Sequence, residues 1–151
     1  DLLVKHGVKS QLLQSGKPGS APVVYGEVIT PGATTTIAFY AHYDGQPVDS
    51  SKWFPGLHPF KPALYSGSYE NGATVLPWLS AGNNYDVNAR IYARGASDDK
   101  AGVMAIINAY AQLKALNIKP TVNIKFFFEG EEEAGSPHLE QFLDVYKNKL
   151  M

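Results

Sequence analysis

The sequence predicts an α/β domain of the three-layer αβα class, with helices on both faces of a largely parallel central sheet. Two observations lead to this prediction. The expected strands are continuous apolar runs, which is typical of strands buried on both faces. These runs alternate along the chain with segments whose apolar residues recur at helical spacing.

The first half of the chain contains two of the expected strands. Residues 1–14 have the pattern of the end of an amphipathic helix, and residues 16–22 are turn material rich in Gly and Pro. A strand follows at 23–29, and residues 36–44 form an apolar, aromatic run of strand length. Residues 45–90 are rich in Pro, Gly, Ser, Asn and Tyr without a clear period, and such long irregular stretches are more often functional or inserted than filler.

The second half continues with strand, helix, strand and helix. Residues 91–95 are expected to form a short strand, and residues 100–116 carry apolar side chains at helical spacing. Pro120 ends that helix, and residues 122–130 form a strongly apolar strand. The Ser-Pro pair at 136–137 is a good start for the last helix.

The composition excludes several classes of protein. With 151 residues, 44% of them hydrophobic and 18% charged, the chain is one ordinary globular domain or part of one. A net charge of -1 gives no electrostatic reason to expect nucleic acid or a membrane surface as a partner, and no apolar run approaches the ~20 residues that span a bilayer. The chain has no cysteine, so any metal must be held by nitrogen and oxygen. The compartment stays open between the cytoplasm and, if a signal peptide precedes residue 1, the periplasm or the exterior.

Acidic residues and one histidine fall at the ends of three expected strands. Because the carboxyl ends of parallel strands share one edge of a sheet, parallel strands would bring these side chains together. Carboxylates a few ångströms apart repel one another, and a divalent cation between them is the simplest remedy. Histidine with carboxylates and no thiolate suits zinc, manganese or cobalt. The residues are His42 and Asp44, then Asp98 and Asp99, then Glu131, Glu132 and Glu133.

Each motif alone has an ordinary structural explanation. His42-x-Asp44 could be a hydrogen-bonded polar strand end, and Ser97-Asp98-Asp99 could be a helix N-cap with acids that complement the helix dipole. The three glutamates could be a solvated charge run. The combination is more specific than any member. A metal-free pair of carboxylates, as in a glycosidase, would not require the histidine motif, and a phosphate loop at 95–102 would place two aspartates where the phosphate must sit.

Four segments resemble, in the same order, a family of co-catalytic zinc hydrolases. The family includes carnosinase-type dipeptidases, carboxypeptidase G, aminoacylase and succinyl-diaminopimelate desuccinylase. The segments cover most of residues 35–140, and they are AHYDGQPVD, W-x-x-x-x-HPFKP, IYARGASDDKAG and FFFEGEEEAGS. The last three look closest to the dipeptidase and carboxypeptidase branches. Ala93 and Ala101 replace glycines that are usual in the family, and residues 66–89 are longer than usual, so the substrate preference stays open.

The resemblance implies a zinc-peptidase-like catalytic domain with two divalent metal ions, zinc first and manganese or cobalt as alternatives. His42 would bind the first ion, and Asp44 would accept the other ring N–H of that histidine. Asp98 would bridge both ions, with a cis peptide bond to the next residue. Glu133 would bind the second ion.

Glu132 would be the general base, which takes a proton from water and passes it to the leaving nitrogen. Glu131 would be left facing the solvent. The implied function is a metallopeptidase that hydrolyses dipeptides or short peptides, with a deacylase of N-acyl amino acids as the alternative. A non-catalytic binding relative would be expected to have lost Glu132 or Asp98. The expected partner is therefore a small peptide or N-acyl amino acid, and a homodimer of the whole protein stays open.

Residues 1–151 are expected to be the N-terminal part of the catalytic domain, without the lid and dimerisation domain and without the C-terminal part of the catalytic domain. The family completes its site with a further acid and a late histidine, and neither follows Glu133. His138, in the first turn of a helix, is expected to face the solvent, and His6 and His58 have no partner readable from the sequence. These residues alone should therefore bind metal weakly and hydrolyse little, and the sheet should keep an open edge or face.

Overall fold

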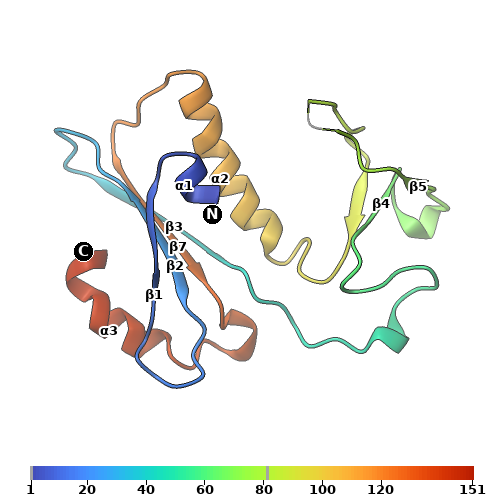
Figure 1. Cartoon of the computed structure of the whole chain (residues 1–151), viewed down its shortest axis with the longest axis horizontal. Coiled ribbons are helices and arrows are strands. Elements are labelled where there is room, and N and C mark those ends of the chain that lie inside the picture. The colour runs from blue at the N-terminus through green and yellow to red at the C-terminus, as the bar shows by residue number, and fades with distance from the viewer. Residues whose placement is uncertain (1, 81) are drawn as a thin grey trace. The chain divides into compact units, whose positions relative to one another are not determined.

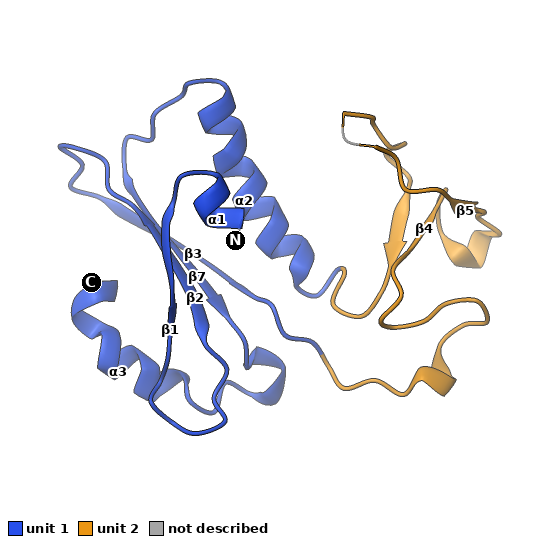
Figure 2. Cartoon of the chain, in the orientation of Figure 1, with its two compact units in different colours: residues 1–45, 97–151 blue, residues 46–96 orange. Residues whose placement is uncertain are grey.

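The computed structural model describes residues 2–80 and 82–151. The chain divides into two compact units, which are coloured separately in Figure 2. Unit 1 comprises residues up to 45 together with residues 97–151, and unit 2 comprises residues 46–96. All seven residues of the histidine and acidic motifs belong to unit 1.

Unit 1 is built on a four-stranded sheet with the strand order β1-β2-β7-β3 (Figure 1). The β1–β2 and β2–β7 pairs are antiparallel, whereas β3 and β7 are parallel. The sheet is therefore mixed, and the expectation of a largely parallel sheet is wrong for the strands that the structure describes. The bounds are β1 (Lys9–Leu13), β2 (Val23–Val28), β3 (Thr36–His42) and β7 (Asn123–Glu129).

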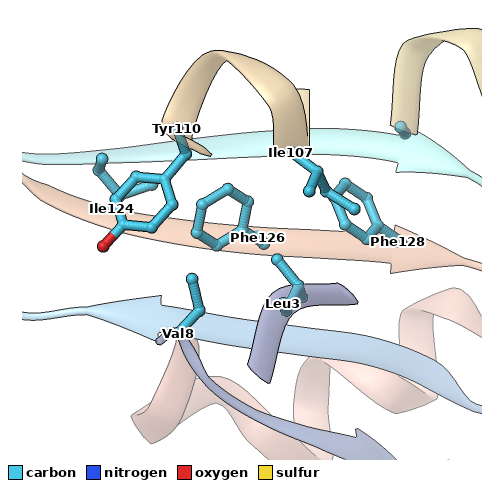
Figure 3. Close-up of a cluster of buried hydrophobic side chains, with 8 residues drawn as sticks. Leu3, Val8, Ile107, Tyr110, Ile124, Phe126 and Phe128 are labelled. Atoms are coloured by element: carbon cyan, nitrogen blue, oxygen red, sulfur yellow. The ribbon is translucent and has the colours of Figure 1, made fainter. Parts of the chain in front are cut away.

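Helices cover both faces of this sheet, which confirms the predicted α/β fold with three layers. α1 (Leu2–Lys5) and α2 (Lys100–Ala115) lie on one face, and α3 (Leu139–Leu150) lies on the other (Figure 1). Successive side chains of a strand point to opposite faces, so the apolar run in β7 contributes to two cores. Figure 3 shows the core under α2, formed by Leu3, Val8, Ala41, Ile107, Tyr110, Ile124, Phe126 and Phe128. The core under α3 contains Leu13, Val23, Tyr25, Phe127 and Phe142.

Two expected elements differ from the structure. Residues 1–14 do not continue as a helix, because the short helix α1 ends at Lys5 and the chain then enters β1 at the edge of the sheet. The short strand expected at 91–95 is β6 (Arg90–Tyr92), and it pairs within unit 2 rather than in the main sheet. No helix among the described residues has both the length and the apolar character needed to cross a membrane.

Unit 2 gives structure to the irregular stretch of the sequence. Its small antiparallel sheet has the order β5 (Val75–Leu76), β4 (Ala63–Tyr65) and β6. Aromatic side chains pack around it: the rings of Tyr65 and Tyr92 are 5.4 Å apart, and those of Phe54 and Tyr69 are 5.2 Å apart. Tyr65 is buried, and Tyr69 and Tyr92 are partly buried, so aromatic packing stabilises this unit although its sequence has no clear period.

The two edges of the main sheet differ in character. β1 carries Lys9, Ser10 and Gln11, whereas β3 exposes the side chains of Ile37, Phe39 and Tyr40 on its two faces. Charged residues are the usual protection of an open edge, and β3 has none before its last residue. Among the described strands, β3 is therefore the open apolar edge.

Candidate metal centre

The parallel pairing of β3 and β7 brings the histidine motif next to the glutamates. His42, the last residue of β3, lies opposite Glu129, the last residue of β7. One further backbone hydrogen bond, from Tyr43 N–H to the Glu129 carbonyl at 2.8 Å, extends the pairing beyond the strands. The chain then enters a 3-10 turn at Glu132–Ala134. The prediction that these two motifs meet at one sheet edge is confirmed.

Asp98 and Asp99 reach the same place by a different route. They precede the N-terminus of α2, which packs on the sheet through Ile107 and Tyr110, and they do not follow a strand of that sheet. The Asp99 carboxylate accepts a hydrogen bond from the His42 backbone N–H at 3.3 Å. The peptide bond between Asp98 and Asp99 is cis, as the family resemblance implied.

The imidazole of His42 lies at the centre of the cluster and is buried. Its Nδ1 is 3.1 Å from Asp44 Oδ1, and its Nε2 is 3.0 Å from Asp98 Oδ1. Glu132 Oε2 is 3.6 Å from the same Nε2. The second oxygen of Asp44, Oδ2, accepts the backbone N–H of Glu133 at 3.0 Å. Asp44 therefore connects the histidine ring to the glutamate turn.

The cluster contains more acidic groups than groups that can carry a positive charge. Burial lowers the pKa of His42, but its hydrogen bonds to Asp44 and Asp98 and the charges of Glu132 and Asp44 outweigh burial, so the net pKa is raised. Tyr40, whose hydroxyl donates to Glu129 Oε2 at 2.7 Å, feels the same negative field. Partial burial, then Glu129, and then the charges of Glu132 and Asp44 raise the pKa of Tyr40 far above its usual range.

Three side chains are placed so that they could share a metal ion. One ligand atom each from His42, Asp98 and Glu133 lies within 4.8 Å of the other two. The side chain of Asp98 is 77% exposed and that of Glu132 is 45% exposed, so the cluster opens to solvent on the carboxylate side. One imidazole nitrogen with carboxylate oxygens suits zinc, manganese or cobalt, and atoms of neighbouring ligands on such an ion are about 3 Å apart. The donor set therefore fits a divalent cation.

The structure contradicts the expectation that Glu131 and His138 face the solvent. The Glu131 side chain is only 15% exposed, and its Oε1 accepts the backbone N–H of Ala21 at 2.9 Å. His138 Nδ1 is 2.9 Å from Glu131 Oε2. The physical reason is that the loop between β1 and β2 folds against the glutamate turn and removes this one carboxylate from water. The sequence gives no signal of this contact, because Ala21 is 110 residues away.

The remaining two histidines stay outside the metal-binding group. His58 Nδ1 accepts a local hydrogen bond from the Phe60 backbone N–H at 3.1 Å. His6 takes part through its backbone carbonyl, which accepts the Lys114 ammonium at 2.7 Å. Of the residues proposed from the sequence, the structure thus brings together His42, Asp44, Asp98, Glu132 and Glu133.

Comparison with known proteins gives a consistent set of relatives. The sequence profile of the peptidase family M20/M25/M40 matches residues 38–150. The human Beta-Ala-His dipeptidase is 33% identical over 129 residues, which are 85% of this chain and 21% of that protein. The Cys-Gly metallodipeptidase dug1 of Schizosaccharomyces pombe is 30% identical over 128 residues, which are 85% of this chain and 22% of that protein.

Solved structures agree with the sequence relatives. Human carnosine dipeptidase 1 superposes with a TM-score of 0.71 at 30% identity, over 98% of this chain and 28% of that one. The M20 family metallo-carboxypeptidase Sso-CP2 of Sulfolobus solfataricus superposes with a TM-score of 0.70 at 36% identity, over 99% of this chain and 28% of that one. The chain spans about a fifth of the length of the curated relatives that it matches.

Proposed function

This chain belongs to the peptidase family M20/M25/M40, and from this premise we propose that it supplies the N-terminal part of a metallopeptidase catalytic domain. The lid and dimerisation domain and the C-terminal part of the catalytic domain lie outside these residues in the proposal. The substrates are dipeptides or short peptides, as the names of the dipeptidase relatives suggest. The observation that carries the proposal is the convergence of His42, Asp98 and Glu133 beside Glu132.

The proposed cofactor is a pair of divalent ions, zinc first and manganese or cobalt as alternatives. His42, Asp98 and Glu133 are the residues that would hold the ions. When bound, such ions supply Lewis acidity that makes a bound water more acidic and polarises the scissile carbonyl. The acids around the buried ring of His42 support this assignment, because they favour a cation beside it.

Asp44 is proposed to orient the ligands rather than to bind metal. Its Oδ1 lies beside His42 Nδ1, so a proton fixed on Nδ1 leaves Nε2 as the free ligand atom. Its Oδ2 accepts the Glu133 N–H, and this bond sets the position of the turn that carries both glutamates. One carboxylate thus orients two proposed ligands, one at the end of β3 and one in the turn after β7.

Glu132 is the proposed general base. Its Oε2 lies 3.6 Å from His42 Nε2, at the edge of the proposed ligand set, and nearly half of its side chain is exposed. A carboxylate in that position can take a proton from an attacking water and deliver it to the leaving nitrogen. Neighbouring residues of a 3-10 turn point in different directions, which lets Glu133 face the metal position while Glu132 faces the water.

Deacylation of N-acyl amino acids is the second candidate, because it breaks the same kind of amide bond with the same groups. The two candidates differ on the acyl side of the scissile bond, which carries a free amine in a dipeptide and none in an N-acyl amino acid. A non-catalytic binding relative is disfavoured because both Glu132 and Asp98 are present.

The test measures the metal content and the hydrolytic activity of the native polypeptide that contains these residues. Dialysis against zinc followed by elemental analysis should give about two ions per chain. Glu132→Gln should keep the metal and lose roughly 100- to 10,000-fold in the hydrolysis rate of Beta-Ala-His, Cys-Gly or N-acetyl amino acids. The matched control is Glu140→Gln, the same change at an exposed position in α3.

Two outcomes would overturn the proposal. A native polypeptide that takes up no zinc, manganese or cobalt would remove the metal mechanism. A Glu132→Gln variant as active as the Glu140→Gln control would remove Glu132 as the base. Residues 1–151 alone should bind zinc more weakly than the native polypeptide if further ligands lie outside them.

A further inference from the structure

A second group of polar side chains lies on the α3 side of the sheet. It is next to the metal-facing group, by which we mean His42, Asp44, Asp98, Glu132 and Glu133. It consists of Glu131 just before the 3-10 turn, His138 just before α3, and Glu129 and Tyr40 near the ends of the parallel strands. We call these four residues the support cluster. Their contacts indicate what keeps the glutamate turn in place.

We propose that Glu131 is a positioning residue for the metal site: its carboxylate, held by Ala21 and His138, fixes the turn that aims Glu132 and Glu133. This inference rests on the proposed function, since it concerns the ligand and the base named there. It assigns to Glu131 neither metal nor substrate.

The side chain of Glu131 is held from two directions. The backbone N–H of Ala21 donates to Oε1 at 2.9 Å, and His138 Nδ1 lies 3.1 Å from Oε1 and 2.9 Å from Oε2. A carboxylate can only accept hydrogen bonds, so Nδ1 carries the proton in this pair. Hydrogen bonds to a charged oxygen are stronger than neutral ones, and both donors come from other segments of the fold.

The backbone of Glu131 closes the same turn. Its carbonyl accepts the N–H of Ala134 at 3.1 Å and the N–H of Ser136 at 2.9 Å. Gly135 and Ser136 both have positive φ, 82° and 52°, which brings the chain back sharply after the turn. Glu131 therefore stands at the base of the turn through its backbone and anchors it through its side chain.

The other end of the turn is fixed by a separate bond. Glu133 N–H donates to Asp44 Oδ2 at 3.0 Å, on the side of the histidine. A short turn held at one end can still pivot, whereas a turn held at both ends cannot. Glu132 lies between the two anchors, so its carboxylate can be aimed only when both are intact.

The segment that holds Glu131 is itself tightly packed. Tyr43, the residue after His42, donates through its hydroxyl to the Pro22 carbonyl at 2.5 Å. A Cβ atom at Gly130 would overlap the Tyr43 hydroxyl and the side chain of Ala21, so this position accepts only glycine in the present packing. The loop before β2 is therefore a rigid partner for Glu131 and not a chance neighbour.

The experiment titrates Zn²⁺ or Co²⁺ alone into the apo protein and records the Co²⁺ visible absorption spectrum and the apo melting temperature. Glu131→Ala should weaken metal binding on the order of tenfold and alter the Co²⁺ spectrum, because the ligand turn pivots. Glu131→Gln keeps an acceptor for Ala21 and should recover most of the affinity. Glu140→Ala, an equal truncation at an exposed site on α3, should leave affinity and spectrum unchanged.

His138→Ala is the second variant, because it removes one of the two donors and leaves the bond from Ala21. It should give a smaller loss of affinity than Glu131→Ala, with a shifted Co²⁺ spectrum. A purely structural role would instead lower the melting temperature and leave affinity and spectrum as in the wild type, and that result would overturn the inference alone. A wild-type protein that binds neither ion would overturn the proposed function and the inference with it.

Discussion

Two groups of acidic residues lie side by side at the end of one pair of parallel strands, and they differ in how their charges are met. In the metal-facing group, Asp98 is largely exposed and Glu132 nearly half exposed, and both approach the same nitrogen of His42, Nε2. In the support cluster, Glu129 is buried against the hydroxyl of Tyr40, and Glu131 is enclosed by donors from two segments.

The comparison shows that a high density of carboxylates does not by itself make a metal site. What distinguishes the two groups is the ratio of protein donors to acids. Glu131 alone has two donors, whereas Asp98 and Glu132 compete for one ring. We therefore expect a cation only on the metal-facing side, because protein donors compensate the charges on the other side.

The largest effect is expected from His42→Ala, which breaks the metal-facing group at its centre. Without the imidazole, the acids lose their shared partner, and the site loses the one nitrogen ligand that the described residues offer. Zinc affinity should therefore fall by more than about 100-fold. Isothermal titration of Zn²⁺ into the apo protein measures it. His58→Ala is the matched control, and equal affinities in the two variants would contradict the assignment.

Asp44→Asn should have the next largest effect. The amide cannot accept from His42 Nδ1 and Glu133 N–H as the two carboxylate oxygens do, so both ligands lose their aim. Loss of such an orienting group typically weakens metal binding roughly 10- to 100-fold. The same titration measures the change, and Asp86→Asn in unit 2 is the control. An affinity within twofold of the wild type would argue that the ring is oriented by other contacts.

Tyr40→Phe should lower the stability without changing metal binding, because it removes a bond of the support cluster that does not hold Glu131. The variant leaves the buried Glu129 without its hydroxyl donor, which should cost about 1 kcal/mol of unfolding free energy, the low end for such a loss because Tyr40 is half-exposed. Urea denaturation of the apo protein measures the stability. Zinc affinity should stay unchanged, because the bond between Tyr40 and Glu129 is separate from the bonds that hold Glu131. A large loss of affinity would mean that Glu129, as well as Glu131, positions the ligands.

The smallest effect is the response of the same tyrosine to alkaline pH. The folded-state pKa of Tyr40 is raised above its unfolded value, so the folded state holds the phenolic proton more tightly. The resulting stability is fully present below about pH 10 and is lost as the pH rises from there through the folded pKa. Denaturation at several alkaline pH values should show a shallower decline in Tyr40→Phe than in the wild type. Parallel declines would show that this hydroxyl is not perturbed by Glu129.

Much of the fold and of the site follows from local patterns. The FFF run predicted a strand buried on both faces, and its three rings do enter two different cores. The pairing of β3 with β7 was enough to bring His42 next to the glutamates. The errors concern long-range pairing. Residues 9–13 form an edge strand because they pair with β2, and residues 90–92 pair with β4 in unit 2.

The sequence by itself determined which residue types gather at the end of the parallel strands, because strand periodicity and chain order fix that edge. It could not determine which glutamate faces which neighbour. Glu131, Glu132 and Glu133 are chemically identical, and their differences arise from Ala21, His42 and Asp44, which contact them across the fold. Only the tertiary structure decided that the first glutamate is enclosed and the next two are turned toward the histidine, because hydrogen bonds between distant segments leave no periodic trace in a sequence.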